Sequence, residues 1–160
     1  MPESFLTSYN FAVQLTLSGF GGDEGLVRDA KGAFSEVTGL ESQIEMTALR
    51  EGGYNAGVRQ LIGKTTQPAL VLKRGLSLDA AFWEWIQRCT GGGYPLPYIN
   101  GTIEVYGPAS NRKKGKPALW RFSNGIVTKV RAADLDAAQS STVPIEELHI
   151  AHEGLHREVQ

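Results

Sequence analysis

The stretch that decides the fold covers residues 34–87 and reads FSEVTGLESQIEMTALREGGYNAGVRQLIGKTTQPALVLKRGLSLDAAFWEWIQ. Two apolar runs, residues 43–50 and 68–73, flank a polar excursion from Glu51 to Gln67 that has no apolar period. Connections longer than about 12–15 residues are uncommon in compact domains, and they are usually either functional or disordered. We therefore predict that the two runs pair as antiparallel strands, and that 51–67 is an arm that contacts something outside its own domain.

A helix is predicted next, over residues 78–89. Ser77 is a good N-cap, and Asp79 in the first turn suits the positive end of a helix. The apolar residues of this segment recur at helical spacing and form one stripe, which comprises Leu78, Phe82, Trp85, Ile86 and Cys89. Trp83 lies off the stripe, and two readings stay open for it. It is either a residue at the edge of the core or an anchor between subunits, where tryptophan is enriched.

The remaining segments read as strands. Residues 9–17 alternate, with Asn10, Gln14 and Thr16 on a small, neutral, wetted face. Residues 100–107 form a further strand, with Ile103 and Val105 as inward candidates. Residues 118–130 are predicted to form a hairpin, because Asn124-Gly125 is a strong signal for a two-residue turn. The last segment, 143–155, also suits a helix by its apolar spacing.

Length and composition bound the class of protein. A chain of 160 residues is most simply one domain, here 1–160 with the protruding arm at 51–67. The formal charge of −1 gives no global basic field for holding nucleic acid. The single cysteine excludes an intrachain disulfide framework. No apolar run approaches the ~18 residues that span a bilayer, and the N-terminal stretch lacks the pattern of a signal peptide. We expect synthesis in the cytoplasm and no membrane partner.

Five segments in order carry a family resemblance, namely FSEVTGLES (34–42), REGGYNAG (50–57), LVLKRG (70–75), a W-x-W helix (83–85) and the ending VPIEELHIAHEGL (143–155). Together they resemble the tail-tube proteins of contractile phage tails and the inner-tube proteins of contractile injection systems. The resemblance covers roughly the whole chain. It implies a mainly β fold, a barrel or sandwich of antiparallel strands with one packed helix. It also favours a strand rather than a helix for 143–155.

The resemblance also implies a function. The chain is expected to form hexameric rings that stack into a hollow tube, a passive conduit with no turnover and no cofactor. Its expected partners are copies of itself, sheath, baseplate or spike proteins, and a protein or DNA cargo in the lumen. The polar side chains of 9–17 are then expected to face the lumen, although ordinary solvent exposure explains them equally well. The candidates for contacts between subunits are Arg50, Glu51, Tyr54, Asn55, Arg59 and Trp83.

Two alternative functions are compatible with the same architecture. One is an adaptor or initiator ring that joins the tube to a baseplate or spike. The loops at 91–97 and 107–117 favour it slightly, because they look longer than in the simplest members of the family. The other is a secreted ring of the type VI effector-carrier kind. The assembled particle is expected to be a virion tail or an extracellular contractile particle.

Three motifs suggest chemistry, and we discount each. Residues 152–156 read H-E-x-x-H, the zinc-binding pattern of metalloproteases, but that pattern requires a helix and a third ligand. Gly63-Lys64-Thr65 resembles the end of a P-loop, but Val58 stands where a glycine is required. Cys89 lies on the apolar stripe, where burial raises a thiol pKa and makes it inert. We therefore expect no catalytic, cofactor or metal residues, and a small zinc hydrolase stays only a remote alternative.

Overall fold

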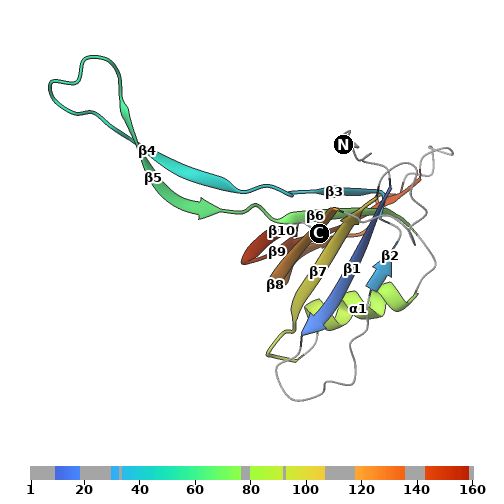
Figure 1. Ribbon diagram of the computed structural model, residues 1–160. Helices are drawn as coiled ribbons and strands as arrows, with labels where there is room; N and C mark the ends of the chain where they lie inside the picture. Colours follow the sequence, from blue (N-terminus) through green and yellow to red (C-terminus); the bar gives the residue numbers. More distant parts are fainter. Residues whose placement is uncertain are drawn as a thin grey trace.

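The computed structural model describes residues 10–18, 30–32, 34–76, 80–91, 93–106, 118–135 and 143–158. Ten strands and one helix are seen in these residues (Figure 1). Their bounds are β1 (Phe11–Ser18), β2 (Ala30–Gly32), β3 (Glu36–Thr38), β4 (Gln43–Leu49), β5 (Arg59–Thr66), β6 (Leu70–Gly75), α1 (Ala80–Gly91), β7 (Tyr98–Val105), β8 (Ala118–Arg131), β9 (Ile145–Ala151) and β10 (Gly154–Glu158).

The body is one antiparallel sheet with the strand order β2-β1-β7-β8-β9-β6-β3, and β10 pairs with β8. Helix α1 lies across one face of this sheet (Figure 1). The expected mainly β fold with antiparallel strands and one packed helix is confirmed. Among the described helices, none combines the length and hydropathy that a membrane span requires.

The core lies between α1 and the sheet. Phe82, Trp85, Ile86 and Cys89 of the predicted apolar stripe are all buried, whereas Leu78 falls outside the described residues, as do Ser77 and Asp79. The aromatic rings of Phe82 and Trp85 stack with centroids 6.3 Å apart. They cover the inward residues of the strands, which are Val13, Leu15, Leu70, Leu72, Ile99, Ile103, Phe122, Leu148 and Ile150. One side of the sheet is therefore sealed by the helix.

The predicted hairpin at 118–130 is wrong. Residues 118–131 form one continuous strand, β8, and Asn124 adopts a left-handed conformation in its middle with φ of 52°. The facing segment is broken at the same level, because β9 ends at Ala151 and β10 begins at Gly154. Asn124-Gly125 therefore bends a long strand instead of reversing it. Asn124 has the positive φ that such a turn also uses, so the dipeptide alone does not separate the two outcomes.

The predicted pairing of 43–50 with 68–73 is also wrong. Strand β4 pairs with β5, which lies inside the excursion that was expected to have no period. Strand β6 pairs instead with β3 and β9 in the body. Glycine at position 39 makes the entry to the hairpin possible, because its φ is 89° and a Cβ there would lie 2.4 Å from the Ala69 carbonyl oxygen. Gly39 thus brings the two legs of the hairpin together at its root.

Candidate assembly surfaces

The β4–β5 hairpin stands clear of the body of the protein (Figure 1). We call residues 43–66 the arm. Every residue from Glu41 to Thr66 is exposed, although the arm carries several large apolar side chains. Met46 and Ile62 are directly opposite each other, and they are 69% and 84% exposed. A two-stranded hairpin is at best marginally stable alone in water.

The tip of the arm gathers three of the predicted contact residues. The Arg59 guanidinium makes an ion pair with Glu51 and lies over the Tyr54 ring, 5.0 Å from its centroid. The Tyr54 amide donates a hydrogen bond of 3.2 Å to the Glu51 carbonyl, which closes the turn. Arg50 and Asn55 are exposed beside them, with no polar partner among the described residues. The tip is therefore pre-shaped by its own contacts.

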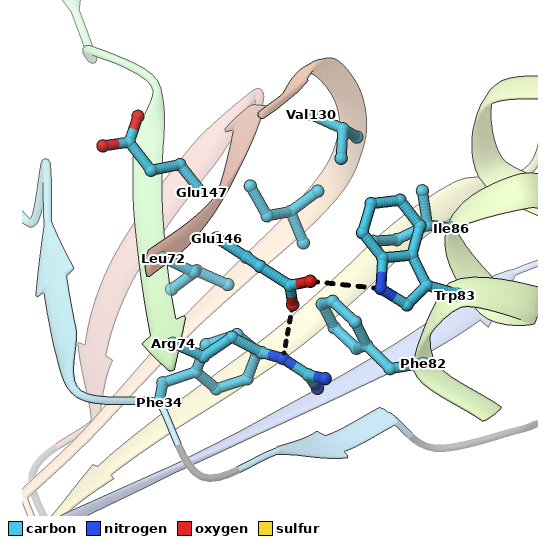
Figure 2. Close-up of a pocket in the computed structure, with 10 residues that line it drawn as sticks. Phe34, Leu72, Arg74, Phe82, Trp83, Ile86, Val130, Glu146 and Glu147 are labelled. Atoms are coloured by element: carbon cyan, nitrogen blue, oxygen red, sulfur yellow. Dashed lines mark hydrogen bonds and ion pairs between the residues drawn. The ribbon is translucent and has the colours of Figure 1, made fainter. Parts of the chain in front are cut away.

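Trp83, the sixth predicted contact residue, has a partner in its own chain. Its indole nitrogen donates a hydrogen bond of 3.2 Å to Glu146, whose other carboxylate oxygen lies 3.0 Å from Nε of Arg74 (Figure 2). Arg74 and Glu146 are buried, and the Arg74 guanidinium stacks 3.8 Å from the Phe82 ring centroid. The space among these residues is too small for a water molecule, so this cluster fastens α1 to β6 and β9 and is not a ligand site.

The face of the sheet opposite α1 is hollowed and polar. A depression of about 410 Å³ is lined mainly by polar residues, namely Gln14, Thr16, Asn100, Thr102, Arg121 and Ser123. Strand register places Gln14 beside Thr102, and Thr102 beside Arg121. Thr16 donates a hydrogen bond of 3.2 Å to the Asn100 carbonyl. Gln14 and Thr16 were predicted for this face. Asn10 does not line the depression, and its carbonyl accepts a hydrogen bond from Tyr106.

Both ends of the strand order are short edge strands. Strand β2 covers only Val13–Leu15 of β1, and β3 covers only Val71–Lys73 of β6. The outer sides of β2 and β3 have no strand partner among the described residues. Unpaired edges of this kind are templates for pairing with another chain.

The family model described as T4-like virus tail tube protein gp19 matches residues 7–156. The chain belongs to this family. This tail tube protein is therefore a structural subunit of a tube. No curated protein matches its sequence.

Solved structures agree on the fold. A chain from the anti-feeding prophage (AFP) baseplate superimposes with a TM-score of 0.77 at 21% identity, covering 98% of this tail tube protein and 97% of that chain. A chain from the sheath-tube complex of an extracellular contractile injection system, PVC, superimposes with a TM-score of 0.71 at 19% identity, covering 99% of this tail tube protein and 95% of that chain. A chain from the sheath/tube terminator of PVC superimposes with a TM-score of 0.73 at 18% identity, covering 99% of this tail tube protein and 100% of that chain.

The H-E-x-x-H residues of the tail tube protein do not form the helix that a zinc site of this type requires. His152 lies at the break between β9 and β10, and His156 lies within β10. The prediction of strand for this segment is confirmed, with the break as an addition. The His152 ring packs 5.8 Å from the Phe122 ring, and the Gly154 and Pro68 backbones lie beside its nitrogens without forming a hydrogen bond of regular geometry. Burial is the largest influence on the pKa of His152 and lowers it below its ordinary value, while these two backbone groups partly offset the shift.

The other two motifs are also structural. Gly63-Lys64-Thr65 lies within β5, so no helix opens after it as a P-loop requires. A Cβ at Gly63 would lie 2.8 Å from the Glu45 carbonyl oxygen, which explains the glycine. Cys89 is buried, and that burial raises its thiol pKa to about 12. The polar residues that sequence reasoning missed, Thr102 and Arg121, alternate with inward residues on β7 and β8, and that alternation was available as a signal.

Proposed function

We propose that this chain is the repeating subunit of the stacked-ring inner tube of a contractile injection system or a contractile phage tail. Copies related by a cyclic rotation close a ring, six being the number that the tail-tube resemblance suggests. The ring closes by pairing strand edges, because β2 and β3 each present an edge without a partner among the described residues. Sheath and baseplate or spike proteins are the unlike partners of such a tube.

The observation that carries the proposal is the arm. Its apolar side chains are exposed on a hairpin that stands away from the body (Figure 1). Burial of apolar surface contributes about 25 cal/mol per Å², so covering these side chains favours association strongly. The arm therefore reaches a subunit other than its own, and the residues at its tip, Arg50, Glu51, Tyr54, Asn55 and Arg59, make contacts there.

The polar depression faces the lumen in this arrangement. Its lining residues are small or neutral apart from Arg121, and Arg121 is already paired with Glu158 at 3.0 Å. Gln14 and Thr16 present neutral polar groups to whatever passes, whether protein or DNA. A neutral hydrated wall holds a cargo weakly, and weak holding suits a conduit through which cargo must move. The tube performs no chemical turnover and holds no cofactor.

The experiment is imaging of the purified protein at high concentration by negative-stain electron microscopy, with sedimentation velocity as the solution measure. Wild-type protein is expected to form rings and stacked tubes. Ile62→Asp puts a charge on the apolar face of the arm and is expected to leave short stacks or single rings. Thr47→Asp is the matched control, because Thr47 is on the opposite face of the arm, and tubes are expected to persist. Monomers at every concentration of wild-type protein would overturn the proposal.

The same images test the adaptor alternative. The loop at 91–97 presents Tyr94 with 91% of its surface exposed, and an end ring must fit an unlike partner. Wild-type rings that never stack on one another, yet bind a separately prepared tube end, would favour an adaptor ring over the main tube. Stacks of many rings favour the main tube.

A further inference from the structure

The three most exposed large apolar side chains of the arm share one face, whereas Leu49 and Leu61 lie on the other face and are less exposed. Side chains alternate along a strand, so Ile44 and Met46 of β4 share a face, and register places Ile62 directly opposite Met46. We call Ile44, Met46 and Ile62 the arm face. All three are exposed, and Ile62 is the most exposed large apolar residue of the arm.

A second exposed apolar surface lies where β6 ends and β9 begins. Gly75 pairs with Ile145, and the Leu76 amide donates a hydrogen bond of 2.9 Å to the Pro144 carbonyl. A Cβ at Gly75 would lie 3.3 Å from a methyl carbon of Val143, so Val143 also lies here. We call Leu76, Val143 and Ile145 the end patch, and all three side chains are exposed.

The two surfaces lie at opposite ends of the sheet. The arm joins β6 at Leu70, which pairs with Ile150, and β6 then runs away from the arm to Gly75 (Figure 1). The arm therefore points away from the end patch of its own chain, and β6 separates the two (Figure 1). A second copy displaced along this direction presents its end patch toward the arm of the first copy.

We propose that the arm face of one copy docks on the end patch of a second copy. The proposal rests on the proposed tube function and names the surface that receives the arm. The contact is heterologous, because two different surfaces meet, and between copies in successive rings, which are displaced along the tube axis, such a contact repeats from ring to ring without closing. Successive rings are joined in this way, and every arm face except that of the last ring is covered.

The charges around the two surfaces are complementary. Beside the end patch, one guanidinium serves two carboxylates, since Arg131 pairs with Asp134 and also lies 3.7 Å from Glu147. Asp134 is exposed over 83% of its side chain. The arm carries Arg50, Arg59 and Lys64 against Glu45 and Glu51, so cations exceed carboxylates on it. The carboxylates of Asp134 and Glu147 beside the end patch share Arg131, and Glu147 also lies 3.5 Å from His149. The excess of positive charge on the arm and the exposed Asp134 beside the end patch are opposite in sign, which favours this orientation of the two copies.

The test mixes two single-cysteine variants, Ile62→Cys on the arm face and Ile145→Cys in the end patch, one of them carrying a larger tag. The native Cys89 is buried with a thiol pKa of about 12, so it adds little background at pH 8. The mixture is assembled, oxidised and separated on a non-reducing gel, and tubes are checked by microscopy. We expect a disulfide-linked heterodimer and little homodimer from either variant alone. If Ile62→Cys prevents assembly, Met46→Cys on the same face replaces it.

Two control variants move the cysteine away from the proposed contact, and the first of them matches its variant in exposure. Ile126→Cys lies at the arm end of the sheet and is 43% exposed, against 40% for Ile145. Leu61→Cys is next to Ile62 on the other face of the arm. Heterodimer yields about tenfold lower with either control support the proposal, because a disulfide needs its two Cβ atoms within about 4.5 Å.

Equal yields with the controls, or a homodimer from Ile62→Cys alone, overturn the docking proposal. Tubes that form normally without any heterodimer also overturn it, while leaving the tube function intact. A wild-type protein that forms neither rings nor tubes instead overturns the tube function itself.

Discussion

Asn124 donates a hydrogen bond of 2.8 Å from its side-chain amide to the Glu153 carboxylate, and the bond links the bend of β8 to the break between β9 and β10. The Asn124 backbone amide donates to the Asn100 side chain at 3.1 Å, at the point where β7 shifts register. The Glu153 amide donates to the Ser123 carbonyl at 3.3 Å. Irregularities in three neighbouring strands therefore fall on one line, and along that line the sheet turns.

Asn124→Ala is expected to lower the free energy of unfolding by about 1–2 kcal/mol. The left-handed conformation is costly for a residue with an ordinary Cβ, and the hydrogen bond to Glu153 is lost. Asn124→Gly is the matched control, because glycine adopts positive φ without that cost, and its loss is expected to be about half as large or less. Chemical denaturation measures both. Equal losses in the two variants would show that the backbone conformation at 124 does not matter.

The ion pair of Arg74 and Glu146 gives a second prediction. Both side chains are about 5% exposed or less, so removing one partner leaves a buried charge without compensation. Arg74→Met is expected to cost about 3–5 kcal/mol in denaturation measurements. Arg74→Met combined with Glu146→Gln is expected to recover a large part of that loss, because no unpaired charge remains.

The exposed pair of Lys73 and Glu36, with nitrogen and oxygen 3.1 Å apart, is the internal control. Lys73 directly precedes Arg74 in β6, and the side chains of Lys73 and Glu36 are 31% and 48% exposed. Lys73→Met is expected to cost less than about 1 kcal/mol, as exposed pairs do. If Arg74→Met lowers the free energy of unfolding no more than Lys73→Met does, burial does not make the Arg74–Glu146 ion pair costly to break.

His152 predicts a pH dependence of stability. Burial lowers its pKa in the folded protein, so the unfolded chain binds a proton more readily as the pH falls below about 6.5. Stability from this group is present above the ordinary histidine pKa and is lost as the pH falls toward the folded value. His152→Phe is expected to reduce the decrease of the thermal unfolding midpoint as the pH falls from 7 to 5. His156→Gln alters an exposed ring and is expected to keep the wild-type slope. Identical slopes for all three proteins would exclude His152 as the source.

Sequence patterns predicted an element correctly where residues close together in the chain all pack against the same surface. The helix stripe was right because residues three and four apart on a helix share one environment, here the face against the sheet. The alternation in β1 was right for the same reason, with Val13 and Leu15 inward and Gln14 and Thr16 outward. The predicted role of the arm as a contact between copies stays a prediction, together with the roles of the lumen residues. The loop at 107–117 lies outside the described residues.

Strand pairing could not be predicted in this way. Residues 43–50 have the alternation of a half-buried strand, yet β4 lies in the arm with both faces exposed, because no other element of the described body packs against it. Strand pairing depends on which strands lie side by side in the folded protein. The alternation of side chains shows which residues share a face of a strand, but it does not show which strand is the neighbour.

The sequence by itself determined the family, the mainly β class, the single helix and the existence of an excursion too long to be an ordinary loop. Only the tertiary structure decided that Asn124-Gly125 bends a strand, that β4 pairs with β5, and that Arg74, Trp83 and Glu146 meet beneath the helix. The physical reason is the distance along the chain between the groups that decide each feature. Helix stripes and strand alternation depend on neighbouring residues, whereas register, bends and buried polar contacts depend on groups far apart in the chain, such as Arg74 and Glu146, which are 72 positions apart.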